Sequence, residues 1–552
     1  MKTNTHSCQQ PSQQQPCASA QQPSCSQPGQ QPCASGHQLC VIGLGYVGLP
    51  LARLFSTKYK TIGFDRNHNR VAEIMSGHDS TMELDECLLK EAIEKNGFFC
   101  TSELEKIKEC NIYIVAVPTP VDENNRPDLT PLIGASRTVG QVISPGDIVI
   151  YESTVYPGVT EEECIPIIEA ESGLTYNKDF YAGYSPERIN PGDKEHTVEK
   201  IKKVTSGSTP QVAEIVDNLY NSVLINGTHK APSIRVAEAS KIIENSQRDV
   251  NIAFMNELAK IFNAMGIDTR DVLEAASSKW NFIKMSPGLV GGHCISVDPY
   301  YLIQKAQVYG VLPRIMTSAR RLNDGMGAYV AEQTIKCMNK KGVLVKDSRI
   351  LILGITFKEN CPDTRNTKVL DIYHTLSEYT RNITIYDPWA NPDSVAREYG
   401  LTITPALPEL SAAGAGAGVG SGGEVSTACA CGEVSAACPA AGTASEVPAA
   451  GAGAVCELPA ECAGGEVSAA GAAAGAGAGS GGELPAACPV AGAVAEVPAG
   501  AAGAAAGKYD AIILAVAHNQ FKDLNYKALL APNGIIYDVK GFLPRELVDA
   551  RL

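Results

Sequence analysis

The sequence lacks any long hydrophobic run, since its plain apolar stretches, such as residues 511–517, fall far short of the roughly 20 residues that a membrane-spanning helix needs. It also lacks a basic stripe, and its formal net charge of −14 argues against nucleic acid as the main partner. Lys2 is followed by no apolar core, so the start is not expected to be a signal peptide. These absences favour a soluble protein that binds no membrane, and the unpaired cysteines of the globular part favour a reducing cytoplasm.

Two segments lack the residues that could build a core. Residues 1–37 are mainly Ser, Gln, Pro, Cys and Gly, and residues 411–507 contain no aromatic residue, Lys, Arg or Asp. Such compositions bury too little apolar surface to offset the entropy of ordering. We therefore expect a disordered N-terminal tail and a low-complexity insertion. Removing these 37 and 97 residues from 552 leaves 418 of ordinary globular sequence, enough for two or three cores.

The globular part also lacks paired cysteines. Ten of the 18 cysteines lie in the two low-complexity segments, and the other eight form no C-x-x-C motif, so neither a metal site nor a redox pair is indicated. Cys294 stands out because it follows Gly291, Gly292 and His293 and precedes Asp298 by four residues. A covalent intermediate could form there. By itself, an unpaired cysteine more often fills space in a core.

A glycine motif near the start of the chain favours the catalytic interpretation of Cys294 over the space-filling one. A short apolar strand at 38–42 leads into Gly43-Leu44-Gly45-Tyr46-Val47-Gly48, a helical pattern at 49–55 and a strand at 60–64 that ends at Asp65. This order is typical of a dinucleotide-binding unit, in which the glycines allow a tight turn beside a pyrophosphate. Asp65, 22 residues after Gly43, would accept from a ribose hydroxyl and repel a 2′-phosphate. NAD is therefore favoured over NADP, and Arg66 is the feature that speaks for NADP.

Polar clusters follow two further predicted strands. The strand-like run at 111–117 leads to Thr119, and the run at 147–151 leads to Thr154. Ligands bind at the carboxyl ends of parallel strands, so both threonines are candidates for the cofactor side. A threonine in this position is also a common cap.

Helical sequence separates two sheet-forming regions. It runs over 232–265, where Lys241 and Asn245 share a helix face, and resumes over 313–338. Strand-like runs return at 349–353, 383–386, 510–516 and 534–538, but the first turn, at 354–358, lacks the glycine motif and should hold something other than a dinucleotide. We expect an α/β protein with two Rossmann-like doubly wound domains joined by a central helical domain. The expected boundaries are 1–37 for the tail, 38–230, 231–340 and 341–552, with the insertion at 411–507.

Taken together, the motifs resemble the nucleotide-sugar 6-dehydrogenases of the UDP-glucose/GDP-mannose dehydrogenase family. The similarity runs through 38–410 and 508–552, and the phrase at 279–301 looks most like the UDP-N-acetylglucosamine and UDP-N-acetylgalactosamine branch. It is carried by the glycine motif, E-S-T at 152–154, Y-S-P-E-R at 184–188, E-A-S-K at 238–241 with Asn245, G-G-H-C at 291–294, Asp298, and F-K-E-N at 357–360 with Asp363 and Arg365.

The resemblance implies that the C6 alcohol of a UDP-sugar is oxidised to a carboxylate in two NAD-dependent steps, for surface polysaccharide. Cys294 would form a thiohemiacetal and then a thioester. Lys241, supported by Asn245, would stabilise the oxyanion. Asp298 would position water with Lys241, Glu187 would act in thioester hydrolysis, and Thr154 would order the water. The implied substrate contacts are Glu187, Lys241, Asn245, Gly291, Lys358 and Arg365.

Three alternatives remain open from the sequence. The substrate could be UDP-glucose or GDP-mannose, although relatives acting on UDP-glucose carry a second acid where this sequence has Pro191. A single NADH per sugar would indicate a simple alcohol dehydrogenase, in which Cys294 is superfluous. A catalytically silent protein that senses nucleotide sugars is the third alternative. Family resemblance also implies at least a homodimer through the central helices.

Overall fold

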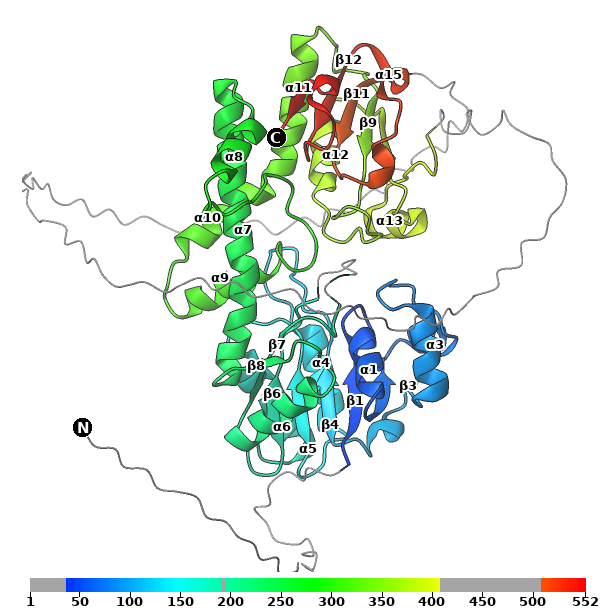
Figure 1. Ribbon diagram of the computed structural model, residues 1–552, viewed down its shortest axis with the longest axis vertical. Coiled ribbons are helices and arrows are strands. Elements are labelled where there is room, and N and C mark those ends of the chain that lie inside the picture. Colours follow the sequence, from blue (N-terminus) through cyan, green and yellow to red (C-terminus); the bar gives the residue numbers. More distant parts are fainter. Residues whose placement is uncertain (1–35, 190–194, 196, 408–507) are drawn as a thin grey trace, which may run out of the picture. The chain divides into compact units, whose positions relative to one another are not determined.

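The computed structural model describes residues 36–189, 195, 197–407 and 508–552 (Figure 1). The whole predicted insertion and Pro191 lie outside the described residues. So does the predicted tail, except for Gly36 and His37. Within the described part, no helix combines the length and the apolar character that a membrane crossing requires.

The N-terminal domain is built on an eight-stranded sheet in the order β3-β2-β1-β4-β5-β6-β7-β8. All neighbours pair in parallel except β6 and β7. The strands are β1 (Gln38–Ile42), β2 (Lys60–Phe64), β3 (Phe99–Thr101), β4 (Ile112–Val115), β5 (Ile148–Tyr151), β6 (Tyr181–Tyr184), β7 (Lys203–Gly207) and β8 (Thr228–Lys230). Six of them follow the doubly wound order of a dinucleotide-binding fold, which confirms the predicted fold class.

Helices cover both faces of this sheet because successive strand residues point to opposite sides. Cys40 and Ile42 of β1 belong to one core cluster, and Leu39 and Val41 belong to the other. Helices α4 (Thr130–Gly140) and α5 (Ile165–Ser172) contribute to the first cluster, and α1 (Gly48–Ser56), α2 (His68–Met75), α3 (Glu86–Lys95) and α6 (Pro210–Asn221) to the second. The 3-10 helix η1 (Leu104–Ile107) and the short π-helix η2 (Thr160–Cys164) complete the domain.

The central segment is dominated by the long helix α7 (Ile234–Met265) (Figure 1). Ser233 caps its start by accepting a hydrogen bond from the Val236 amide, and Gly266 ends it in the left-handed conformation. Against α7 pack α8 (Thr269–Ser277), α9 (Asp298–Val308) and α10 (Arg314–Asp324). The helical pattern expected over 313–338 is divided at Gly325 into α10 and α11 (Met326–Lys340).

The C-terminal domain has a five-stranded parallel sheet in the order β10-β9-β11-β12-β13. Its elements are β9 (Ile350–Leu353), α12 (Val369–Ser377), β10 (Ile383–Tyr386), α13 (Pro392–Tyr399), β11 (Tyr509–Leu514), η3 (Asn519–Phe521), α15 (Tyr526–Leu529), β12 (Leu530–Asp538), η4 (Arg545–Leu547) and β13 (Ala550–Arg551). Leu407 and Tyr509, on either side of the 408–507 segment, belong to the same buried cluster. The chain therefore returns to one core after the insertion.

Candidate active site

The carboxyl ends of the first sheet's strands open into a cleft of about 760 Å³. The glycine turn forms one wall, and residues from the 293–298 loop and from the C-terminal domain complete it. Of the predicted site residues, the cleft is lined by Gly43, Gly45, Tyr46, Val47, Asp65, Arg66, Thr119, Thr154, Glu187, Cys294, Asp298 and Arg365.

The glycines of the turn have separate roles. Gly43 has a φ of +90°, and a Cβ there would lie 2.8 Å from the Ala116 carbonyl oxygen. A Cβ at Gly48 would lie 1.8 Å from the Gly43 carbonyl oxygen, so Gly48 allows α1 to pack against the turn. A Cβ at Gly45 would meet no atom within 4 Å. The chain thus leaves space beside Gly45 at the start of α1, where backbone N–H groups can bind a pyrophosphate.

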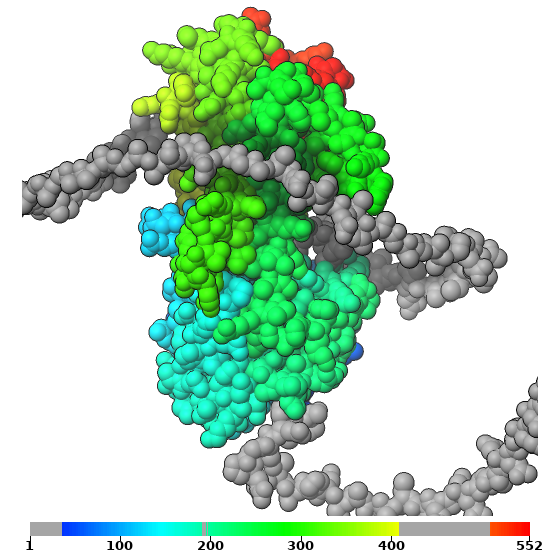
Figure 2. Space-filling view, turned by 90° about the vertical axis from the view of Figure 1, so that its left-hand side faces the viewer, coloured from blue at the N-terminus to red at the C-terminus, as the bar shows by residue number. Residues whose placement is uncertain are grey.

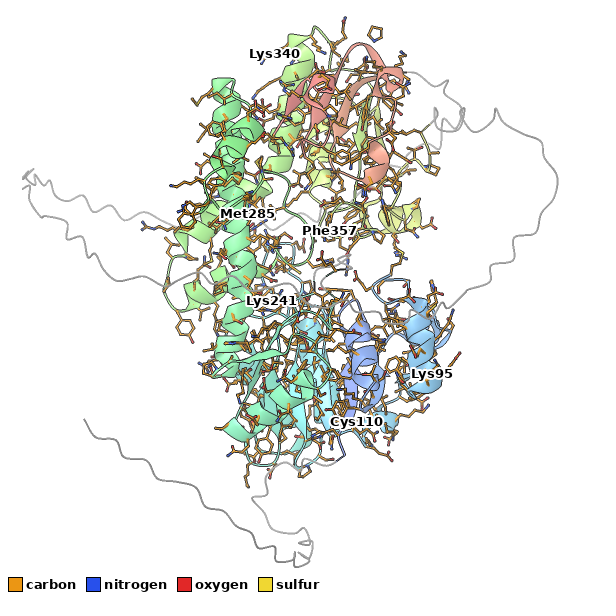
Figure 3. All side chains as sticks on the ribbon, viewed as in Figure 1. Lys95, Cys110, Lys241, Met285, Lys340 and Phe357 are labelled. Carbon is orange, nitrogen blue, oxygen red and sulfur yellow. The ribbon has the colours of Figure 1, made fainter. Side chains whose placement is uncertain are left out.

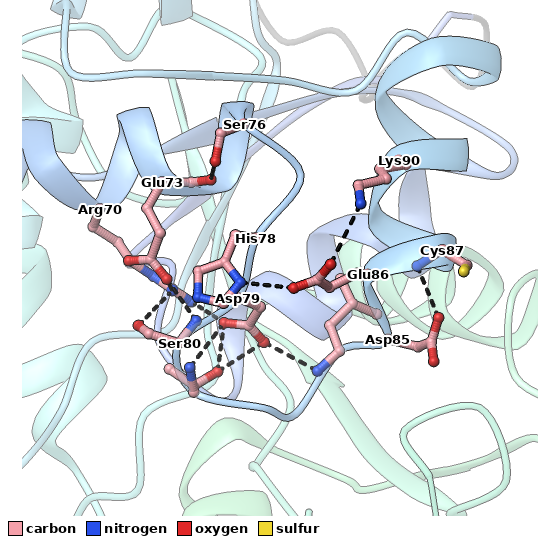
Figure 4. A network of polar contacts seen from close by, with 12 residues as sticks. Arg70, Glu73, Ser76, His78, Asp79, Ser80, Asp85, Glu86, Cys87 and Lys90 are labelled. Atoms are coloured by element: carbon pink, nitrogen blue, oxygen red, sulfur yellow. Dashed lines mark hydrogen bonds and ion pairs between the residues drawn. The ribbon is translucent and has the colours of Figure 1, made fainter. Parts of the chain in front are cut away.

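Asp65 and a polar network behind it fix the shape of this turn. The Leu44 amide donates to Asp65 Oδ2 at 2.9 Å, and Arg70 Nε donates to the Leu44 carbonyl at 3.0 Å. Arg70 is held in turn by the buried Asp79 at 2.6 Å and by Glu73 at 2.9 Å (Figure 4). Each Asp65 oxygen keeps a lone pair for a ribose hydroxyl. The sequence analysis missed Arg70, although its position in the first turns after Asp65 could have been noticed.

The two candidate threonines lie side by side. Thr119 Oγ1 donates to the Thr154 carbonyl at 2.8 Å, which joins the ends of β4 and β5. Both residues line the cleft beyond the carboxyl ends of the strands, and their contact with the cofactor stays a prediction.

Cys294 lies on the loop that precedes α9. The preceding glycines touch the C-terminal domain: a Cβ at Gly292, whose φ is +85°, would lie 2.8 Å from the Phe357 ring. A Cβ at Gly291 would lie 2.7 Å from the Asn366 carbonyl oxygen. Phe357 is labelled in Figure 3. The G-G pair therefore lets the loop pass against the second sheet domain while it carries the thiol to the cleft.

Two polar pairs lie near enough to the thiol to act on its charge. On α7, Asn245 Nδ2 donates to Asp298 Oδ2 at 2.6 Å, and Lys241 Nζ lies 3.6 Å from Glu187 Oε2. Lys241, labelled in Figure 3, is only 4% exposed. The four residues come from three separate stretches of sequence, so the structure brings the predicted catalytic set together.

These neighbours shift the pKa values of the site. Burial raises the pKa of Cys294 to about 12, Asp298 and Glu187 add to the rise, and Lys241 opposes it. Burial likewise raises the pKa of Asp298 to about 6, against the opposing effects of Lys241 and Asn245. Burial lowers the pKa of Lys241, but the charges of Glu187 and Asp298 outweigh it and leave the pKa raised. Near neutral pH the thiol is protonated, Lys241 is charged, and Asp298 is poised to exchange a proton.

Arg365 and Lys358 differ in their position relative to the cleft. Arg365 donates to Asp363 Oδ2 at 2.7 Å, and its guanidinium lies 5.9 Å from the Tyr46 ring centroid, at the glycine turn. Arg365 therefore lines the same cleft as the dinucleotide turn, and Lys358 is not among the described residues that line it. His293 stands beside Cys294, and burial, followed by Arg365, lowers its pKa to about 4.

A second cavity of about 420 Å³ lies between α8, the 284–287 loop and the ends of β12 and β13. Four basic side chains line it, Arg270, Lys284, Lys540 and Arg551, together with Asp271 and Glu274. Lys540 Nζ lies 3.8 Å from the Cβ position of Gly288, on the loop that leads to Cys294. The sequence analysis missed this basic group because its members are spread over residues 270–551.

A dinucleotide fold whose cleft is lined by a thiol and two carboxylates, with Lys241 beside Glu187, is the arrangement of an NAD-dependent dehydrogenase. Comparison with known families agrees: the NAD-binding, central and UDP-binding domains of the UDP-glucose/GDP-mannose dehydrogenase family match residues 37–224, 235–325 and 351–419. The chain belongs to this family and is an NAD-dependent nucleotide-sugar 6-dehydrogenase. The predicted family, enzyme class and cofactor are confirmed, whereas the predicted domain boundaries stay predictions.

Among relatives, a UDP-N-acetyl-D-glucosamine 6-dehydrogenase of Pseudomonas aeruginosa is 60% identical over 365 residues, which cover 66% of this chain and 86% of the relative. An enzyme of the same name from Salmonella typhi is 58% identical over 364 residues, 66% of this chain and 85% of the relative. The solved structure of a UDP-D-ManNAc dehydrogenase from Pyrococcus horikoshii aligns with a TM-score of 0.69 at 24% identity, over 93% of this chain and 98% of that one. At this identity the structure supports the fold alone.

Proposed function

We propose that the chain oxidises the C6 alcohol of a UDP-N-acetylhexosamine to the uronic acid through a covalent intermediate on Cys294. The observation that carries this proposal is the Cys294 thiol at the cleft of the glycine turn, with the Lys241–Glu187 and Asn245–Asp298 pairs near it. The N-acetylhexosamine is supported by the names of the relatives at 58–60% identity. As the family resemblance implies, we also propose that the product supplies surface polysaccharide.

The side chains suit two successive oxidations. NAD, when bound, accepts the hydride that the C6 carbon loses in each oxidation, so each sugar yields two NADH. Asp298 accepts the alcohol proton through an ordered water, and charged Lys241 stabilises the developing oxyanion. After the first oxidation, Asp298 passes the alcohol proton to solvent. The Cys294 sulfur then bonds to the aldehyde carbon, and the thiol proton leaves to Asp298. After the second, the carbon is held as a thioester.

Hydrolysis then releases the acid. A water ordered by the Thr154 region and Asp298 adds to the thioester carbon, and Glu187 takes a water proton. The C–S bond then breaks, and Asp298 returns the proton that restores the Cys294 thiol. Lys241 again stabilises the oxyanion that forms during the addition. Atoms balance with one water consumed per sugar.

Two sets of basic side chains can hold the rest of the substrate. One lines the second cavity, and the other consists of Lys358 and Arg365. The cavity with Lys284 and Lys540 lies along the loop that leads from Gly288 to Cys294, and fixed positive charge there suits a diphosphate. We retain Gly291 and Lys358 as proposed substrate contacts. Because Arg365 lies over Tyr46, we propose that Arg365 acts between substrate and cofactor rather than on the uridine diphosphate alone.

The proposal includes a homodimer in the cytoplasm. A stripe of large apolar side chains on α7 is exposed, namely Ile243, Phe254, Ile261 and Met265 at 46–63%. The central helices are drawn in green in Figure 2. Such a stripe on a helix suits burial against a second copy. All eight cysteines of the described residues are free, as a catalytic thiol in a reducing compartment requires. Sedimentation velocity on Phe254→Glu, which should dissociate the dimer, tests the stripe.

A substrate panel tests the proposed function. UDP-N-acetylglucosamine, UDP-N-acetylgalactosamine, UDP-glucose and GDP-mannose are each incubated with NAD, and both NADH and the sugar product are quantified. We expect the N-acetylhexosamines to give two NADH per sugar and a uronic acid. Preference for UDP-glucose or GDP-mannose would reject the substrate assignment, and one NADH per sugar would reject the cysteine route.

A further inference from the structure

A buried ion pair lies directly behind Glu187. Lys203 Nζ at the start of β7 lies 2.5 Å from Glu152 Oε2, just after β5, and the two side chains are 2% and 0% exposed. Tyr220 of α6 donates to the other carboxylate oxygen, Glu152 Oε1, at 2.5 Å. The catalytic steps above use none of these three residues.

Stability is a weak reason for such a pair. Removing two charges from water costs several kcal/mol per ion, and replacing a buried ion pair by apolar side chains of similar volume is often neutral or stabilising. The pair therefore invites a reason other than folding, and its remaining contacts supply one.

Those contacts are hydrogen bonds to both sides of one peptide bond, the one that joins Pro186 to Glu187. Lys203 Nζ donates to the Pro186 carbonyl oxygen at 3.0 Å, and the Glu187 amide donates to the Glu152 carbonyl at 3.1 Å. The Pro186 carbonyl and the Glu187 amide belong to the same planar peptide unit. Glu152 thus holds one side of this unit through its backbone and the other side through Lys203. The backbone that precedes the Glu187 side chain is thereby fixed in position and orientation.

The same segment also carries Thr154. The Glu152 amide donates to the Val115 carbonyl at 2.8 Å, and Ser153 Oγ donates to the Val117 carbonyl at 2.6 Å. Thr119 Oγ1 then donates to the Thr154 carbonyl. Glu152 therefore links the two segments: it lies two residues before Thr154 in the chain, and its carbonyl accepts the hydrogen bond from the Glu187 amide.

We propose that Lys203 and Glu152 are positioning residues that hold the Pro186–Glu187 peptide so that the Glu187 carboxylate faces the water that hydrolyses the Cys294 thioester. This inference rests on the proposed function. In the affected step, water adds to the thioester carbon, a water proton moves to Glu187, and the C–S bond breaks. The first oxidation uses Lys241 and Asp298, and the second also uses Cys294. Neither needs Glu187 as a base, so the pair should act on hydrolysis of the thioester.

Lys203→Met and Glu152→Gln test this inference in the full-length protein. For each variant, intact-mass spectrometry measures the fraction of enzyme that carries the sugar on Cys294 at steady state, and stopped-flow absorbance measures the NADH burst. The control is Arg320→Met, which breaks the Arg320–Asp249 pair, equally buried at 2% and 0% with 2.5 Å between its charged atoms. Glu187→Gln serves as the reference for blocked hydrolysis. Tyr220→Phe removes one hydrogen bond and is the mildest variant should the others fold poorly.

We expect Lys203→Met and Glu152→Gln to slow acid release about tenfold to a hundredfold, because a displaced catalytic group loses activity on this scale. The Cys294 adduct should accumulate as it does in Glu187→Gln, while the NADH burst stays within about twofold of the parent. Arg320→Met should lower the melting temperature without adduct.

An equal slowing of the burst and of acid release, without adduct, would overturn the inference while the cysteine route stands. So would an Arg320→Met variant that accumulates adduct. If Glu187→Gln traps no adduct and Cys294→Ala retains activity, the proposed function itself fails and the inference falls with it.

Discussion

The two sheets of this molecule begin with the same turn and differ in what fills it. After β1, Gly43 has a φ of +90° and the next amide donates to Asp65, at the end of β2. After β9, Gly354 has a φ of +92° and the next amide donates to Asp387, at the end of β10, at 2.7 Å. The strand, glycine and acid framework is therefore repeated, although the second turn lacks the full glycine motif.

The space beside the second turn is taken by protein groups. Thr356 stands where the first turn has Gly45, and its Oγ1 lies 3.0 Å from Nε2 of the fully buried His518. The Asn360 amide donates to His518 Nδ1 at 2.9 Å, so the ring proton lies on Nε2, which faces Asp387 Oδ2 at 3.1 Å. Asp387 is thus satisfied internally, whereas Asp65 borders an open cleft. The comparison indicates that the open space beside the turn, more than the framework, decides where a dinucleotide binds.

Filling the first turn should produce the largest loss. Gly45→Val places side-chain atoms where a Cβ now meets nothing within 4 Å, and we expect the KM for NAD to rise about a hundredfold or more, equal to nearly 3 kcal/mol. Steady-state kinetics with varied NAD measure this. The matched variant in the second turn, Thr356→Val, should leave the KM for NAD within about twofold. A rise in the KM for NAD in Thr356→Val as large as that in Gly45→Val would break the comparison.

Emptying the second turn should affect stability instead. His518→Ala leaves the buried Asp387 carboxylate without its imidazole partner and creates a cavity, so we expect the free energy of unfolding to fall by about 2–4 kcal/mol. Urea denaturation measures the loss, and the KM for NAD should hardly change. If His518→Ala left the stability unchanged but weakened NAD binding, the dinucleotide would have to bind at the second sheet, and the comparison would fail.

The cleft of the first sheet should also show a pH dependence that the filled turn lacks. Asp298 acts as a carboxylate, and burial raises its pKa to about 6, so it is protonated below that pH and ionised above it. Turnover should therefore rise about tenfold between pH 5 and pH 7. The Cys294 pKa of about 12 lies too high to create this rise. Asp298→Asn should lower turnover and flatten the profile, and a full pH response in that variant would reject the assignment.

Removing the segment inserted in the second domain should have the smallest effect. Leu407 and Tyr509 share one core cluster, so a short linker can close the chain. We expect deletion of residues 411–507 to leave turnover on the best substrate within several-fold. Loss of all activity, with the thermal stability unchanged, would show that the segment takes part in catalysis.

Local patterns predicted much of the fold and of the first site. The strands at 38–42, 60–64 and 383–386 match β1, β2 and β10, because short apolar runs between turn residues carry their own signal. The resemblance also supplied Cys294, Lys241, Asn245, Asp298 and Glu187, which the structure brings together.

Features that depend on tertiary pairing could not be predicted. Lys203 and Glu152 are 51 residues apart, and nothing near either residue indicates a partner. The position of Arg365 over Tyr46 depends on contacts between two domains. The antiparallel pairing of β6 with β7 and the helix break at Gly325 were also missed, since neither leaves a strong local pattern. The filled second turn depends on His518, which lies 162 residues after Thr356.

The rate of acid formation by Cys294→Ala tests the central claim most directly. The acid formed from the best UDP-sugar is quantified over time. NADH binding to the same variant is measured as the control that its cofactor cleft is intact. We predict that acid formation falls at least about a thousandfold while NADH binding stays unchanged, because the aldehyde then has no sulfur to hold it for the second oxidation. Acid delivered at the parent rate by the variant without this sulfur would contradict the account.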